Sequence, residues 1–219
     1  MRTPSTQLIN DTPNIYSPAN VAVEPVFIRF NGSLDFPSIY RGPPSPEIDA
    51  AWNGIANNLT QMTREEILKG GTSEAELPWK ARYPEKIGGQ YIGFMEAIHQ
   101  LHCVNFLRQA SWWEYYGSIQ EPVFQTTPRV VRAHIDHCIE MIRQNIMCRA
   151  DTTMISWYWV QGETTPLPNF NTRHRCRNFD KIWDWSIKNS IHLAETEVAR
   201  SPDSVDLPRP QGHVHVHEE

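Results

Sequence analysis

The chain contains one short pattern twice, first as His99-Gln-Leu-His102-Cys103 and then as His134-Ile-Asp-His137-Cys138. Both copies continue at the same offset with an Arg-Gln pair, Arg108-Gln109 and Arg143-Gln144. On an α-helix, residues at i, i+3 and i+4 share one face, so both histidines and the cysteine of each copy point the same way. Two such helices facing each other would gather four imidazoles and two thiols, as metal sites in helical bundles do.

Hydrophobic periodicity predicts that the chain is mainly α, with the two long motif-bearing helices packed in a small helical bundle, long ordered loops and little β structure. The first long helix is expected over residues 91–116. The second is expected over residues 128–148, with Thr127 as N-cap and Pro128 in the first turn. We expect an extended N-terminal arm over residues 1–46, a helical catalytic domain over residues 47–190 and a tail over residues 191–219.

Shorter elements are indicated around these helices. The arm contains a candidate strand at residues 21–30, and a helix is expected to start near Pro46. Thr63-Arg-Glu-Glu66 has the form of a capping box and predicts a short helix that follows it. An aromatic and β-branched stretch at 154–160 predicts a strand, and a helix is expected near residues 179–188.

Composition narrows the class of protein. The net charge of −5 and the pI near 6 provide no basic surface for nucleic acid. Three N-x-S/T sequons, at Asn10, Asn31 and Asn58, and an even number of cysteines favour a secretory lumen, although chance sequons in a cytosolic protein are the alternative. The sequence has no apolar run long enough to cross a bilayer and no apolar signal-peptide core, so we expect a lumenal protein to have lost its signal or anchor.

The histidines are the candidate catalytic and metal-binding residues: His99, His102, His134 and His137. Imidazole suits copper, zinc, iron and nickel, and four histidines without a carboxylate favour copper or zinc. Hydrogen-bonded structural histidines are the alternative. Glu96, one turn before His99, is a candidate to orient a metal-bound imidazole, and His174 is a candidate further ligand.

The cysteines allow two interpretations. Cys103 and Cys138 are positioned to join the metal shell as thiolates. In an oxidising lumen the four cysteines would instead form two disulfides, with the pairing open; the candidates are Cys103, Cys138, Cys148 and Cys176. The repeated Arg108 and Arg143 either clamp a substrate carboxylate or pair with acids of the chain itself.

Several stretches resemble the UstYa family of fungal proteins: the two H-x-x-H-C motifs, the lead-in Gly89-Gln-Tyr-Ile-Gly-Phe-Met-Glu, and the elements 44–52, 147–152 and 174–179. The resemblance covers roughly residues 40 to 188. It implies an enzyme of mycotoxin and other secondary-metabolite biosynthesis, often of ribosomally made peptides, with copper at the two motifs. Members usually carry an N-terminal transmembrane helix, which this sequence lacks.

Together, these observations lead to the hypothesis of a copper-dependent oxidase that uses dioxygen on a peptide-like or aromatic fungal metabolite. The expected reaction is an oxidative cyclisation, hydroxylation, desaturation or halogenation. One alternative is a non-redox cyclase or hydrolase that uses the histidines with zinc or as acid and base; iron is the other alternative metal. A non-catalytic partner of a biosynthetic enzyme is the third hypothesis. Association with further copies or with related family members is also expected.

Overall fold

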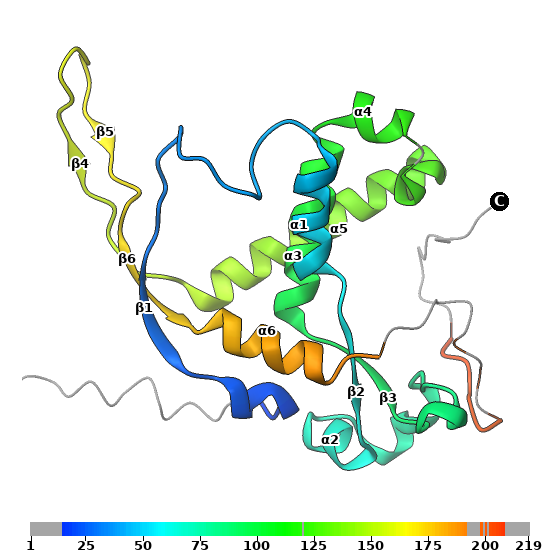
Figure 1. Cartoon of the computed structure of the whole chain (residues 1–219). Coiled ribbons are helices and arrows are strands. Elements are labelled where there is room, and N and C mark those ends of the chain that lie inside the picture. The colour runs from blue at the N-terminus through cyan, green and yellow to red at the C-terminus, as the bar shows by residue number, and fades with distance from the viewer. Residues whose placement is uncertain (1–14, 120, 192–197, 199, 201, 209–219) are drawn as a thin grey trace, which may run out of the picture.

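The structure is a computed structural model that describes residues 15–119, 121–191, 198, 200 and 202–208. The α-helices are α1 (Pro46–Ala56), α2 (Arg64–Lys69), α3 (Glu96–Ala110), α4 (Trp113–Ser118), α5 (Pro128–Arg149) and α6 (Phe179–Lys188). Short 3-10 helices are η1 (Pro18–Ala22), η2 (Glu74–Trp79), η3 (Glu85–Ile87) and η4 (Pro122–Gln125). The prediction of a mainly helical chain is confirmed (Figure 1).

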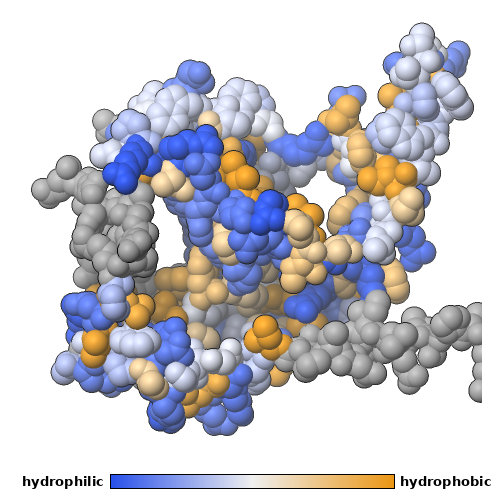
Figure 2. Space-filling model, turned by 180° about the vertical axis from the view of Figure 1, so that it is seen from behind, coloured by the Kyte–Doolittle hydropathy of each residue, from blue (hydrophilic) through white to orange (hydrophobic). Residues whose placement is uncertain are grey.

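The described strands form three two-stranded antiparallel sheets. They pair β1 (Pro25–Arg29) with β6 (Arg173–Arg177), β2 (Leu59–Met62) with β3 (Tyr91–Phe94), and β4 (Trp157–Tyr158) with β5 (Leu167–Pro168). The β4–β5 hairpin projects from the helical body in Figure 1, and Figure 2 shows hydrophobic side chains near its base. Strand β1 pairs along its whole length with β6, so this part of the expected arm is joined to the domain by a sheet.

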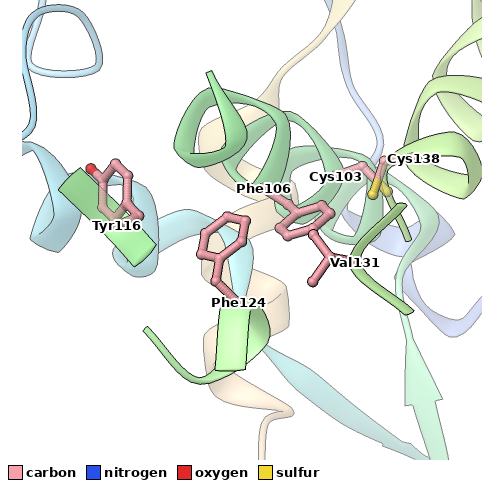
Figure 3. Close-up of a cluster of buried hydrophobic side chains, with 6 residues drawn as sticks. All are labelled: Cys103, Phe106, Tyr116, Phe124, Val131 and Cys138. Carbon is pink, nitrogen blue, oxygen red and sulfur yellow. The ribbon is translucent and has the colours of Figure 1, made fainter. Parts of the chain in front are cut away.

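Helices α3 and α5 pack against each other, and α1 packs against α3. Helix α6 packs against η1 and β2 instead, so the helices of the described part do not all join one bundle. A buried cluster contributed by α3, α4, η4 and α5 is shown in Figure 3 and consists of Cys103, Phe106, Tyr116, Phe124, Val131 and Cys138. The two motif-bearing helices therefore hold the core of the molecule directly behind their histidines.

The expected starts of α1, α2 and α5 are confirmed, and each of these helices has a side-chain cap. Ser45, Thr63 and Thr127 each accept a backbone N–H from the first turn of the helix that follows, and Glu66 completes the predicted capping box. Side-chain acceptors at these positions satisfy amide groups that have no partner inside the helix. The long helix expected over residues 91–116 is wrong at both ends, as described next.

Residues 91–94 form strand β3, and the helix begins only at Glu96. A Cβ at Gly93 would lie 3.1 Å from the Thr60 hydroxyl, so glycine permits the close pairing of β3 with β2. At the other end α3 stops at Ala110, and the separate helix α4 follows after Trp112. Of the expected strand at 154–160 only β4 is present. No described helix is long and apolar enough to cross a membrane.

Candidate metal centre

The two copies of the motif meet across the α3–α5 contact. The ring centroids of His99 and His137 lie 5.6 Å apart, and those of His102 and His134 lie 6.0 Å apart. The first histidine of each copy thus faces the second histidine of the other, which is the pairing expected for helices that run in opposite directions where they meet. The structure brings together all four histidines that the sequence nominated.

One group of side chains has donor atoms close enough to share a metal ion. Ligand atoms of His99, Cys103 and His137 lie within 4.8 Å of one another. Donors about 2.1 Å from a tetrahedral metal lie about 3.4 Å apart, so these side chains need only small rotations to reach coordination distance. His137 is exposed, which leaves the group accessible to small molecules from solvent. The donor set of imidazoles and a thiol fits copper or zinc.

The other two histidines are held by neighbours. The His102 Nδ1 lies 3.1 Å from the Oδ1 of Asn57, the residue after α1. The ring of Phe106 stacks on His134 with centroids 4.2 Å apart. Burial, followed by the neighbouring imidazoles, lowers the pKa of His134 to about 4 and lowers that of His102. Both rings are therefore neutral at pH 7, and a neutral imidazole has the nitrogen lone pair that a metal requires.

Glu96 lies where the sequence suggested. Its Oε2 is 3.3 Å from the Nδ1 of His99, and its Oε1 accepts a hydrogen bond from Gln100 at 2.8 Å. A carboxylate that accepts from one imidazole nitrogen fixes the tautomer and directs the other nitrogen away from it, and the His99 Nε2 lies 3.7 Å from the Cys103 sulfur. Glu96 therefore orients the His99 ring so that its Nε2 faces Cys103.

All four cysteines are free thiols in this structure, so the expected disulfides are not confirmed. Cys103 and Cys138 are fully buried with their sulfurs side by side (Figure 3). Burial raises the pKa of both thiols, so without a metal they are neutral and pack as small hydrophobic groups. Cys148 is exposed and Cys176 is half-buried. Of the two motif cysteines, the structure places Cys103 in the candidate ligand group.

The two arginines nominated as substrate contacts have structural partners instead. Arg108 pairs with Asp49 of α1 at 2.5 Å and donates to the Tyr116 hydroxyl at 2.6 Å. Arg143 pairs with Glu140, one turn before it on the exposed side of α5, at 2.5 Å. Both guanidinium groups are engaged by groups of the chain, so the substrate-clamp prediction is not supported.

His174 lies in a different environment from the four motif histidines. One ring nitrogen contacts Asp151 and the other contacts Thr172. His174 is therefore not part of the ligand group formed by His99, Cys103 and His137, and its role as a further metal ligand stays a prediction. Asn57 was not predicted, because its approach to His102 depends on how α1 packs against α3. Phe106 was detectable, since it is an apolar residue one turn after His102.

The three sequons have different environments. Asn31 is exposed, whereas Asn58 is 2% exposed and its Nδ2 donates to the Ser186 hydroxyl at 2.6 Å. The burial of Asn58 and the engagement of its amide nitrogen do not support the glycosylation prediction at this residue. Asn10 lies outside the described residues.

Comparisons with known proteins agree with the resemblance of the motifs. The sequence model of the family described as "Mycotoxin biosynthesis protein UstYa" matches residues 1–189. Over 156 residues the chain is 35% identical to the UstYa family oxidase phomYc of Diaporthe leptostromiformis, an alignment that covers 71% of this chain and 60% of the relative. Over 159 residues it is 33% identical to the UstYa family oxidase aprY of Aspergillus flavus, with 70% and 48% covered.

A more distant relative has a different name. The transacylase cctO of Talaromyces islandicus is 27% identical over 193 residues, which is 85% of this chain and 64% of that protein. The chain thus spans about half to two thirds of the length of these curated relatives. No solved structure matches the chain.

Proposed function

The chain belongs to the UstYa family, and from this premise we propose that it is a copper-dependent oxidase that modifies a peptide-like or aromatic secondary metabolite with dioxygen. The observation that carries the proposal is the juxtaposition of the two H-x-x-H-C motifs, with ligand atoms of His99, Cys103 and His137 within 4.8 Å. Family relatives named as oxidases support the redox assignment. The reaction is proposed to be a cyclisation, hydroxylation, desaturation or halogenation.

Copper is favoured over the other metals by the chemistry of the donors. When bound, copper would supply one-electron chemistry with dioxygen, which zinc cannot supply because it has no accessible redox change. Non-haem iron sites for dioxygen commonly include a carboxylate ligand beside two histidines. Here the nearest carboxylate, Glu96, already contacts the His99 ring and serves to orient it.

The residues around the site have separate tasks in this proposal. His99 and His137, with Cys103, provide the first donors, and His102 and His134 stand behind them as neutral imidazoles. Phe106 covers one face of His134 and excludes water from it. The exposed His137 marks the side from which a substrate approaches. Orientation and partial exclusion of water are thus the contributions of the protein, and electron transfer is that of the metal.

The cellular setting is also a proposal. An exposed sequon at Asn31 and an even number of cysteines favour the lumen of the secretory pathway, where a glycan could be added. We also propose association with a second copy or a related family member. Three apolar residues in the C-terminal half of α5, Ile139, Ile146 and Met147, are exposed in the single chain and support this proposal.

Oxygen uptake tests the proposed function. The metal-free protein is truncated before His213, so that His213, His215 and His217 of the tail do not bind metal. It is loaded with copper or with zinc, freed of unbound metal by gel filtration and supplied with ascorbate as the probe reductant in an oxygen electrode. We expect uptake only by the copper-loaded protein, its loss in the His99→Ala/His134→Ala double variant, and its retention in the control Gln144→Ala on the exposed side of α5. Equal uptake by the double variant would place any copper elsewhere. A protein that consumes no dioxygen with copper would favour the non-redox alternative.

A further inference from the structure

A second site is suggested by a cavity whose lining includes none of the four motif histidines. This cavity of about 1170 Å³ lies along the β1–β6 sheet and reaches α3 at Leu101. Its lining is largely apolar and includes Ile28, Phe30, Ile155 and Phe170. Two of its other lining residues, Thr172 and His174, carry a hydroxyl and an imidazole, which can act as a nucleophile and as a base. An apolar cavity with a few convergent polar groups is the usual form of a small-molecule site.

Those two residues and Asp151 form a chain of hydrogen bonds. The His174 Nδ1 lies 2.6 Å from the Asp151 Oδ2, and the His174 Nε2 lies 2.8 Å from the Thr172 hydroxyl. A carboxylate accepts only, so the Nδ1 carries the ring proton and donates it. The Nε2 is then an acceptor, and the Thr172 hydroxyl donates to it. This is the arrangement of a nucleophile, a base and a group that orients the base.

Each member of the chain is fixed by the structure around it. Thr172 and His174 are two residues apart on an extended segment and therefore project to the same side. Phe30 stacks on the His174 ring with centroids 3.9 Å apart. The backbone N–H of Thr153 donates to Asp151 at 2.8 Å. Hydrogen bonds from Thr153 and then from His174 lower the pKa of Asp151 to about 2, so it stays charged at pH 7.

This cavity and the metal centre are separate. Leu101 follows His99 by two residues and precedes His102 by one, so on the helix it projects about 200° and about 100° away from them. The side of α3 that lines the cavity is therefore not the side that faces α5. Chemistry at Thr172 would need no metal ligand.

We propose that Thr172, His174 and Asp151 form an acyl-transfer site for esters or thioesters whose apolar acyl group occupies the cavity. The Thr172 oxygen attacks the acyl carbonyl carbon while its proton passes to the His174 Nε2. The C–O or C–S bond of the substrate then breaks, and the leaving alcohol or thiol takes the proton from His174. Asp151 holds the imidazole in the required tautomer and stabilises its protonated form.

The second half of the reaction returns the protein to its starting state. An acceptor alcohol, amine or water gives a proton to the His174 Nε2 and attacks the acyl–Thr172 ester. The bond to the Thr172 oxygen breaks, and that oxygen recovers its proton from His174. No electrons are gained or lost, so neither an oxidant nor a metal is required.

The test uses the full chain in the presence of a chelator, with p-nitrophenyl hexanoate as the probe. Release of p-nitrophenolate is followed by absorbance, and the acylated peptide is identified by mass spectrometry. We expect the hexanoyl group on Thr172. Release should fall at least about 100-fold in Thr172→Val and in His174→Gln, the scale of general-base catalysis, and should persist in Thr172→Ser and in the control Thr164→Val on the exposed hairpin loop.

Several results would overturn the proposal. One is an unacylated protein, and another is an acyl group on a different residue that forms equally in the parent and in Thr172→Val. Circular dichroism checks the fold of each variant. If Thr172→Val does not fold, the position of the acyl group in the parent and in Thr172→Ser decides the question. Because the chelator removes metals, failure here leaves the copper proposal unaffected.

Discussion

Replacing Arg108 by methionine removes the charge that joins α1, α3 and α4. Its guanidinium contacts Asp49 at 2.5 Å, the Tyr116 hydroxyl at 2.6 Å and the Asn105 side chain at 2.9 Å. Tyr116 is fully buried and donates to Asp49 as well, at 2.6 Å. In Arg108→Met the Asp49 carboxylate keeps the Tyr116 hydroxyl but loses its counter-charge in a partly dry site.

The cost follows from the burial of the pair. The side chains of Arg108 and Asp49 are 12% and 22% exposed. Removing one partner of a buried ion pair costs about 3 to 5 kcal/mol, and the partial exposure of Asp49 places the expected loss near 3 kcal/mol. The repeat supplies a matched control, because Arg143 occupies the same motif position but pairs with Glu140 at 51% and 48% exposure. Breaking such a surface pair costs about 0 to 1 kcal/mol.

The assay is urea unfolding of both methionine variants and the parent, followed by far-ultraviolet circular dichroism. We expect Arg108→Met to lower the free energy of unfolding by about 3 kcal/mol, and Arg143→Met to lower it by less than about 1 kcal/mol. Equal losses in the two variants, or a loss below about 1 kcal/mol for Arg108→Met, would refute the structural role assigned to Arg108.

Three further outcomes are expected. In the metal-free protein the pKa of His134 is lowered from 6.5 to about 4, so the unfolded chain binds a proton at higher pH than the folded chain; stability is full above about pH 6.5 and decreases toward pH 4. The free energy of unfolding should fall between pH 7 and pH 4 by about 2 kcal/mol less in His134→Gln than in the parent, a value reduced for solvent screening. Gly32→Ala would place its Cβ 2.3 Å from that of Phe170, so we expect a loss of about 1 to 3 kcal/mol by the same assay, and an unchanged stability would contradict this contact. When the chain is expressed through a secretory pathway, peptide mass spectrometry should find glycan on Asn31 and none on Asn58; a glycan on Asn58 would contradict its burial.

Patterns formed by neighbouring residues predicted the structure most reliably. Side-chain caps at Thr63 and Thr127 act within one helical turn, so the starts of α2 and α5 can be placed from neighbouring residues alone. The repeated spacing of His99 and His134 likewise predicted that two helices would present imidazoles to each other. Periodicity and capping are properties of a few adjacent residues, so they can be recognised in the sequence without knowledge of the fold.

Contacts between distant segments could not be predicted from the sequence. Residues 91–94 were expected to be helical but form strand β3. Their pairing with β2 is a contact between distant segments, which overrides local preference and cannot be predicted from neighbouring residues. The partner of Arg108 is Asp49, fifty-nine positions earlier, and nothing in the spacing of the motif nominates it. Thr172, His174 and Asp151 come together through the β1–β6 sheet and the segment that follows α5, so the sequence showed His174 only as an additional histidine.

Copper binding by the paired motifs is the central claim, and metal analysis with electron paramagnetic resonance tests it most directly. The chain is truncated before His213, so that the tail histidines do not bind metal, and is compared with the His99→Ala/His134→Ala variant. The account predicts stoichiometric copper with nitrogen hyperfine structure in the parent, and its loss from a variant that remains folded by circular dichroism. A parent that binds no copper, or a folded variant that binds as much as the parent, would contradict it.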